Sequence, residues 1–132
     1  MTQSEIREII IKLIYPFLLD GDTNYSYNLE NLDEFTKIKP HELEYINKVI
    51  STIIESNDKI KAIVEKNVEG FELKRIYTVD LCILYLAIYE LVINAVLPKA
   101  IAIDEAVELS KKYSTKKSPK FINGILAKIV KE

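Results

Sequence analysis

The stretch VDLCILYLAIYELVIN, residues 79–94, decides how the rest of this chain folds. Its apolar residues surround the axis of a helix instead of forming one stripe, a pattern typical of a helix covered on every side. The run from Leu81 to Pro98 approaches the length of a membrane span, but Glu90 stands at its centre, and an acidic group there costs about 3 kcal/mol to insert. We therefore predict a buried central helix, capped at its start by Thr78.

Helical periodicity continues on both sides of this central stretch. Apolar residues recur at intervals of three and four, and the helices predicted from them cover 3–19, 40–56, 59–68, 79–94, a segment from Pro98 to about Tyr113, and a last segment from Ser118. No run alternates with period two for long enough to form a sheet. The predicted fold class is all-α, a compact helical bundle of about six to seven helices.

Breaks between the helices follow from turn-forming and capping residues. Pro16 predicts a kink or an early end of the first helix, and Asp20-Gly21-Asp22 stops it. Residues 20–39 hold at most a short helix around 29–35. Further expected features are an N-cap at Asn57 or Asp58, a helix end at Glu69-Gly70, a short helical turn over 71–76, and an N-cap at Ser118 before Pro119.

Composition narrows the class of protein before any motif is considered. The chain has 132 residues, of which 48% are hydrophobic and 29% charged, with 3 Gly and 4 Pro, so we expect one folded domain. A single Cys and a single His exclude an internal disulfide and a Cys/His zinc cluster. The N-terminus lacks the pattern of a signal peptide, and we expect a cytoplasmic protein without membrane attachment.

Motifs that carry catalysis are missing from the sequence. It contains no phosphate-binding glycine loop, no dinucleotide-binding motif and no H-E-x-x-H, and Cys82 and His41 have no partners for nucleophilic chemistry. We expect Cys82 to be a core residue and His41 to be an exposed residue of a helix first turn. The chain is predicted not to be an enzyme and to use neither cofactor nor metal.

The C-terminal end is the first hint of function because it is strongly basic. Within 111–132, seven lysines are balanced only by Glu132. Lys116 and Lys117 precede the N-terminus predicted at Ser118, and Lys120 and Phe121 follow it. Backbone N–H groups and lysines can bind phosphate, and an aromatic ring can stack on an unpaired base. RNA contact and an ordinary solvated face are equally consistent with this pattern.

The polar residues of the central helix also have two interpretations. Tyr85 and Tyr89 can pack with their hydroxyls on polar partners, Asp80 can complement the helix N-terminus, and Glu90 can form a salt bridge. The alternative, which the residues alone favour less, is contact with a protein partner.

The second half of the chain resembles the NusB family of bacterial transcription antitermination factors. The resemblance rests on an ordered set of residues over about 71–130: Phe71-Glu72-Leu73-Lys74-Arg75-Ile76, Val79-Asp80, Ile83-Leu84, Ala87-Ile88-Tyr89-Glu90-Leu91, Pro98, Ile103-Asp104-Glu105-Ala106-Val107-Glu108-Leu109, Lys112-Tyr113 and Ser118-Pro119-Lys120-Phe121-Ile122-Asn123-Gly124-Ile125-Leu126. Residues 1–70 fit more loosely, through Arg7, Glu8 and Ile14-Tyr15.

This resemblance implies a function and a division of the chain. It implies two small helical subdomains, about 1–70 and 71–132, and binding of single-stranded boxA-type RNA together with NusE, a small-subunit ribosomal protein, in support of the elongating RNA polymerase. The expected RNA-binding residues are Arg7, Tyr15, Lys116, Lys117, Lys120 and Phe121. The expected protein-partner residues are Asp80, Tyr89 and Glu90. The resemblance leaves the oligomeric state open between a monomer and a homodimer, because family members occur as both.

Departures from the family pattern leave a second function open. NusB proteins usually begin with an arginine-rich cluster, but Gln3, Ser4 and Glu5 stand there in this chain. Tyr85, Lys117 and Val96 also replace an arginine and two acidic residues that are usual in the family. The lysines at 116–117 are hypothesised to offset part of the N-terminal loss. The alternative is a protein–protein adaptor that keeps the scaffold and has lost most RNA recognition.

Overall fold

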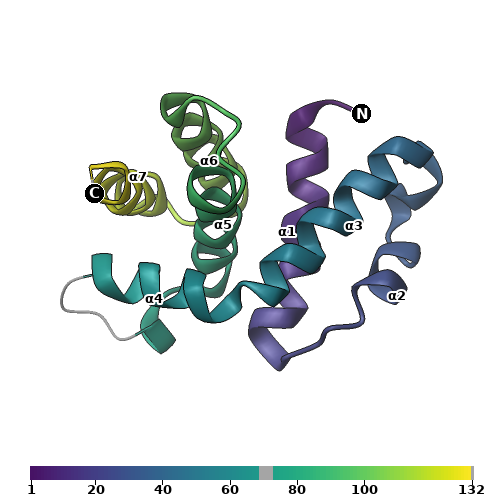
Figure 1. The fold of residues 1–132 in the computed structure, drawn as a ribbon, viewed down its shortest axis with the longest axis horizontal. Coiled ribbons are helices and arrows are strands. Elements are labelled where there is room, and N and C mark those ends of the chain that lie inside the picture. The colour runs from purple at the N-terminus through teal and green to yellow at the C-terminus, as the bar shows by residue number, and fades with distance from the viewer. Residues whose placement is uncertain (69–72, 132) are drawn as a thin grey trace.

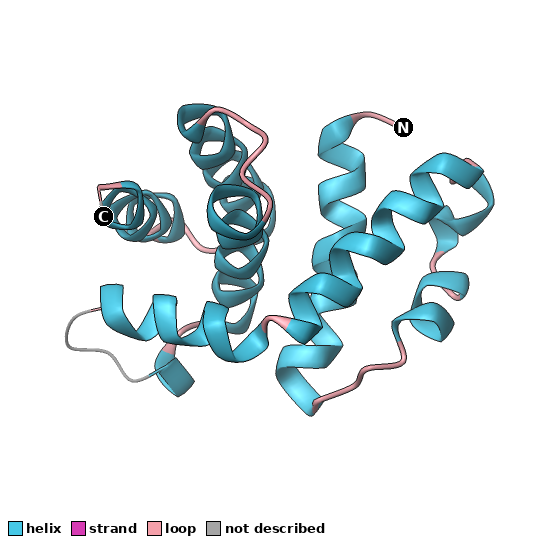
Figure 2. Cartoon of the chain, in the orientation of Figure 1, coloured by secondary structure: helices cyan, strands magenta, loops and turns pink. Residues whose placement is uncertain are grey.

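The computed structural model describes residues 1–68 and 73–131, and this part of the chain is helical, with no strand. Its elements, shown in Figures 1 and 2, are α1 (Gln3–Asp20), α2 (Tyr25–Glu30), the 3₁₀ turn η1 (Asp33–Lys37), α3 (Pro40–Glu55), α4 (Asn57–Asn67), the 3₁₀ turn η2 (Leu73–Arg75), α5 (Thr78–Ile88), the π-helical turn η3 (Tyr89–Ile93), α6 (Lys99–Tyr113) and α7 (Ser118–Val130). The all-α class is confirmed.

α5 is the centre of the bundle, as its sequence predicts. Every residue from Asp80 to Leu91 is buried, and α5 packs against α1, α4, α6 and α7. In Figure 1 it stands between α1 and α3 on one side and α7 on the other. α4 contacts α7 and α5 as well as α3, and the buried apolar side chains form one continuous core. The subdomain boundary near residue 70 stays a prediction.

α1 shows how local chemistry sets the limits of a helix. Thr2 Oγ1 accepts a hydrogen bond from Glu5 N at 3.1 Å, and Glu5 Oε1 accepts one from Thr2 N at 2.9 Å, which together form a capping box. The helix continues through Pro16 to Asp20, so of the two effects expected of Pro16 the early end does not occur, and the kink stays a prediction. It ends at Gly21, whose φ of 72° lies in the left-handed region that glycine adopts without strain.

The predicted capping residues are the main errors. Tyr77 precedes α5 and Lys117 precedes α7, at the positions predicted for Thr78 and Ser118. Ser56 precedes α4, where Asn57 or Asp58 was predicted. None of these three preceding residues caps its helix through a side-chain hydrogen bond. The short helix predicted over 29–35 is replaced by α2 and η1. The helix end at Glu69-Gly70 and the start of the turn at Phe71 lie outside the described residues.

The central stretch is also not one regular helix. Its last turn widens into η3, where Asn94 N donates to Tyr89 O at 2.8 Å. Single π-helical turns within α-helices are often found at functional sites. Within residues 1–68 and 73–131, no helix combines the length and the apolar character needed to cross a membrane.

Candidate nucleic-acid interface

The connector between α6 and α7 is held in place by a buried carboxylate. Asp80, in the first turn of α5, is 6% exposed. Its Oδ2 accepts a hydrogen bond from Ser118 Oγ at 3.0 Å, and the Ser114 hydroxyl donates to Oδ1. The Thr115 N–H donates to Ser118 Oγ at 3.1 Å. Asp80 therefore ties both ends of the connector to the central helix.

The connector, residues 114–117, and the first turn of α7 display the predicted basic residues. Lys116, Lys117 and Lys120 are exposed, and Phe121 is partly buried in the first turn of α7. Ser118 is buried because its hydroxyl faces Asp80, so it does not cap α7 as the sequence suggested. The structure thus brings four of the six predicted RNA-binding residues to the start of α7.

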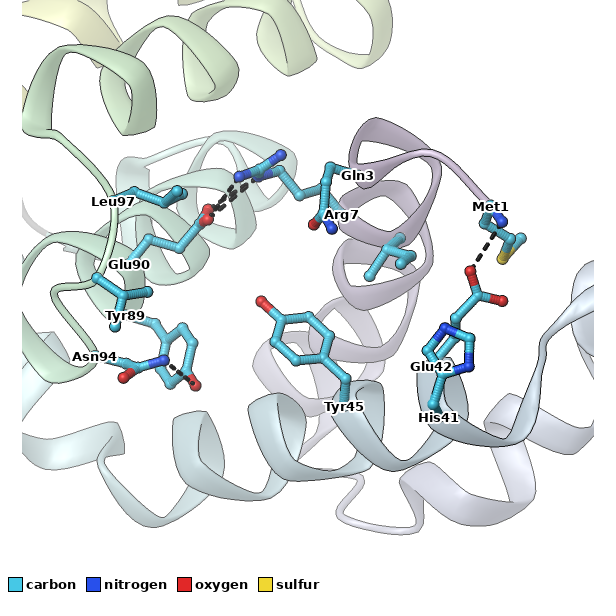
Figure 3. A pocket seen from close by; sticks show the side chains of 12 residues that line it. Met1, Gln3, Arg7, His41, Glu42, Tyr45, Tyr89, Glu90, Asn94 and Leu97 are labelled. Carbon is cyan, nitrogen blue, oxygen red and sulfur yellow. Dashed lines mark hydrogen bonds and ion pairs between the residues drawn. The ribbon is translucent and has the colours of Figure 1, made fainter.

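Arg7 lies elsewhere, inside the protein. Its side chain is 9% exposed and forms an ion pair with Glu90, whose side chain is 8% exposed. Nη2 lies 2.8 Å from Oε2, and Nε lies 3.1 Å from Oε1 of the same carboxylate. Glu105 adds a contact of 3.5 Å to Nη1. Figure 3 shows Arg7 reaching from α1 to Glu90. The guanidinium is engaged within the molecule, and its predicted RNA contact has no support from this position.

Burial and the neighbouring Glu90 have opposite effects on the pKa of Arg7, and the combined effect of Glu90 is the larger. Burial acts to lower the pKa of the Arg7 guanidinium, but the hydrogen bonds and charge of Glu90 outweigh it, and this pKa is raised. Tyr45 of α3 lies beside the pair in Figure 3, in a pocket of about 580 Å³ that Arg7 and Glu90 line with His41. His41 is exposed in the first turn of α3, as predicted.

Tyr15 lies on the exposed side of α1 and is 39% exposed. It shares a shallow pocket of about 230 Å³ with Glu8, Lys12 and Tyr113. Glu8 accepts hydrogen bonds from Lys112 Nζ and from the Tyr113 hydroxyl. Burial acts to raise the pKa of Glu8, but these two hydrogen bonds prevail, and the pKa lies below its ordinary value. Tyr15 is therefore available to a ligand, in a pocket that also includes Tyr113, the last residue of α6 before the connector.

The three predicted protein-partner residues, Asp80, Tyr89 and Glu90, are all buried. The Tyr89 hydroxyl accepts a hydrogen bond from Asn94 Nδ2 at 3.3 Å, and Glu90 pairs with Arg7. The Tyr85 hydroxyl, also buried, donates to Asn57 Oδ1 at 2.7 Å, and burial raises the pKa of Tyr85 to about 12. These polar side chains of the central helix therefore form hydrogen bonds and a salt bridge within the protein and do not face solvent.

Two residues near the connector were not predicted from the sequence. Arg75 and Tyr77 are exposed, and they line a groove of about 220 Å³ together with Lys117 and Phe121. They lie far from the connector in the sequence, on the other side of α5 and α6, so no local pattern joins them to it. The only available signal was an aromatic and a basic residue directly before the central helix.

These features define a small all-helical binding protein, organised around one buried helix and displaying a basic connector. No cluster of His, Cys, Asp and Glu that could hold a metal occurs in the described ranges 1–68 and 73–131.

The family follows from comparison with known proteins. The model of the NusB family matches residues 4–131, and the chain belongs to this family. It is 41% identical to the transcription antitermination protein NusB of Acetivibrio thermocellus over 125 residues, which cover 95% of this chain and 86% of the relative. It is 37% identical to that of Finegoldia magna, over 99% of this chain and 95% of the relative.

Solved structures agree with this assignment. NusB of T. maritima superposes with a TM-score of 0.89 at 32% identity, covering 100% of this chain and 92% of the other. A crystal structure of the antitermination factors NusB and NusE in complex with dsRNA contains a chain that superposes with a TM-score of 0.83 at 26% identity, covering 99% of this chain and 98% of that one.

Proposed function

We propose that this protein acts in transcription antitermination by binding boxA-type RNA jointly with a NusE-type ribosomal protein, and that it affects RNA polymerase through this complex. The function of the relatives and the NusB–NusE–dsRNA neighbour support this proposal. The proposal also includes a cytoplasmic location and no catalytic activity of its own.

The observation that carries the proposal is the ordered basic connector. Three exposed lysines, Lys116, Lys117 and Lys120, surround the start of α7, where helix N–H groups carry partial positive charge. Such a surface binds phosphates and releases their counterions. Because Asp80 fixes the connector through Ser114 and Ser118, the lysines lose less freedom on binding than they would on a loose loop.

The three buried residues Asp80, Tyr89 and Glu90 take an indirect part in partner binding. Asp80 sets the conformation of the connector, Glu90 joins η3 to α1 through Arg7, and the Tyr89 hydroxyl accepts a hydrogen bond from Asn94 after η3. We assign these three residues to shaping the surface that NusE meets, and not to direct contact.

Titration of labelled boxA-type RNA at two salt concentrations tests the proposal, with this protein alone and with NusE from its own organism. We expect affinity to rise with NusE and to fall steeply with salt. The double variant Lys116→Ala/Lys117→Ala should reduce the slope of log affinity against log salt by about 1.4, since each phosphate contact to a single strand contributes about 0.7. Lys37→Ala/Lys48→Ala, which removes two exposed lysines from η1 and α3, is the matched control.

One observation favours the adaptor as a second candidate function. The first turn of α1 displays Gln3, Ser4 and Glu5, while Arg7 is buried against Glu90, so this end of the helix offers no free cation. Binding of NusE without any RNA binding, alone or in the complex, would establish the adaptor and refute the RNA proposal. A paired duplex of the same sequence, titrated in parallel, distinguishes recognition of single strands from recognition of duplex.

A further inference from the structure

The groove beside the connector has the composition of a site for a nucleobase. Tyr77 directly precedes α5 and is 54% exposed, and Phe121 lies in the first turn of α7. Both line a groove of about 220 Å³ together with Arg75 and Lys117. This volume is below the roughly 300–1,000 Å³ of pockets that enclose a whole small molecule, so it suits one ring system with the rest of the ligand outside.

Tyr77 forms no side-chain hydrogen bond with the other residues that the structure describes, and its side chain does not pack into the core. Its carbonyl accepts the hydrogen bond from Leu81 N at 3.0 Å that begins α5, but its side chain does not cap the helix. The structural contribution of Tyr77 therefore comes from the backbone, and its ring is exposed where it lines the groove. A large exposed aromatic ring beside cations is typical of surfaces on which unpaired bases stack.

Hydrogen bonds join the polar residues that line the groove, and basic residues line it as well. Asp80, Ser118 and Thr115 line it, and hydrogen bonds join all three. Asp80 is the only acid among the described residues that line the groove, and its carboxylate accepts hydrogen bonds from two hydroxyl groups. Lys116 and Lys120 continue the positive charge along the connector and α7. A polyanion with flat rings fits this combination better than an acidic or apolar peptide does.

We propose that one unpaired base of a bound RNA enters this groove and stacks on Tyr77 and Phe121, while Arg75 and Lys117 hold the flanking phosphates. This inference rests on the proposed RNA-binding function and adds to it a specific base site with two residues, Arg75 and Tyr77, outside the basic connector.

The absence of tryptophan from the chain makes the test direct. In Tyr77→Trp, the new indole is the only one in the protein, and we expect single-stranded RNA to quench its emission. Tyr77→Ala should weaken binding about five- to 150-fold, the usual loss for one stacked base, and Tyr77→Phe should bind like the unchanged protein. Tyr27, 62% exposed on α2, provides the matched controls Tyr27→Ala and Tyr27→Trp.

RNA with a single abasic nucleotide, moved along the sequence, shows whether a base is the ligand. At one position the abasic RNA should bind as weakly as the Tyr77→Ala variant binds intact RNA, and combining the two changes should cost nothing further. Arg75→Ala should lower the salt slope by about 0.7 without changing the quenching.

The outcomes separate this inference from the proposed function. If RNA does not bind the unchanged protein with or without NusE, the proposed function fails and the base site fails with it. If RNA binds and depends on Lys116 and Lys117, but Tyr77→Ala equals Tyr27→Ala and the indole emission of Tyr77→Trp does not change, the base site alone is refuted.

Discussion

Removing the guanidinium of Arg7 should be among the most damaging single changes in this protein. The side chains of Arg7 and Glu90 are about one-tenth exposed and lie 83 positions apart in the sequence. They meet through two-point contact, with distances of 2.8 Å and 3.1 Å, so the pair fastens α1 to η3. Arg7→Ala leaves the Glu90 carboxylate buried without its partner.

The expected loss follows from this burial. Breaking a buried pair from one side costs about 3–5 kcal/mol because an unpaired charge remains inside. A domain of this size has a free energy of unfolding of about 5–15 kcal/mol, so Arg7→Ala removes a large share of it. Replacing both partners with apolar residues of similar volume, as in Arg7→Met/Glu90→Leu, should be neutral or stabilising, since neither charge then remains buried.

Urea unfolding followed by far-ultraviolet circular dichroism measures both variants. With a dependence of about 2 kcal/mol per molar urea, a loss of about 4 kcal/mol lowers the midpoint of Arg7→Ala by about 2 M. A loss under about 1 kcal/mol, or a double variant as unstable as the single one, would refute the assignment of Arg7 to an internal pair. RNA affinity of the double variant is a second readout: an unchanged salt slope is expected, because an internal Arg7 touches no phosphate.

Further predictions concern separate parts of the fold. Because Lys112 and Tyr113 hold the pKa of Glu8 below its ordinary value of 4.5, their contribution to stability is present above that pH and lost as the pH falls through the lowered pKa. The difference in urea midpoint between the unchanged protein and Glu8→Gln should therefore shrink on acidification below 4.5; a constant difference would contradict this. Gly21→Ala should lower the free energy of unfolding by about 1–2 kcal/mol because the φ of Gly21 is 72°, although no atom lies within 4 Å of the added Cβ. Gly124→Ala, equally uncrowded but inside α7, should raise it by about 0.5–1 kcal/mol. Urea unfolding checks the sign of both changes. Cys82 is fully buried with its thiol pKa raised to about 12, so iodoacetamide should modify it only in urea, and rapid labelling of the folded protein, detected by mass spectrometry, would show this environment to be wrong.

Helices that bury one face could be predicted well from the sequence. The spacing of apolar residues predicted a helix over 40–56, and α3 covers Pro40–Glu55. The all-round apolar stretch predicted a covered helix, and α5 is that helix. In both cases burial of apolar surface is the main stabilising contribution, and the positions of the apolar residues in the sequence show which faces of the helix are buried.

Capping residues and polar partners could not be predicted in the same way, because their hydrogen bonds depend on what else lies nearby. Ser118 before Pro119 has the sequence of an N-cap, but a buried carboxylate 38 positions away takes its hydroxyl instead. The lysines around it were predicted correctly as exposed residues, since nothing buried competes for them. Tyr77 and Arg75 were missed because only the tertiary fold brings them to the connector.

The two acidic residues of the central helix are buried, whereas residues that contact a partner directly would be exposed. Asp80 and Glu90 are the only charged residues from Thr78 to Ile93, and they stand near opposite ends of this segment. One binds the hydroxyls of the α6–α7 connector, and the other binds Arg7 of α1. Apolar packing alone tolerates small shifts of helices, whereas hydrogen bonds to a buried carboxylate fix position and direction. Apolar packing therefore stabilises the central helix, whereas Asp80 fixes the connector at one end of it and Glu90 fixes α1 at the other. Changes at these acids should alter ligand binding without any contact to the ligand.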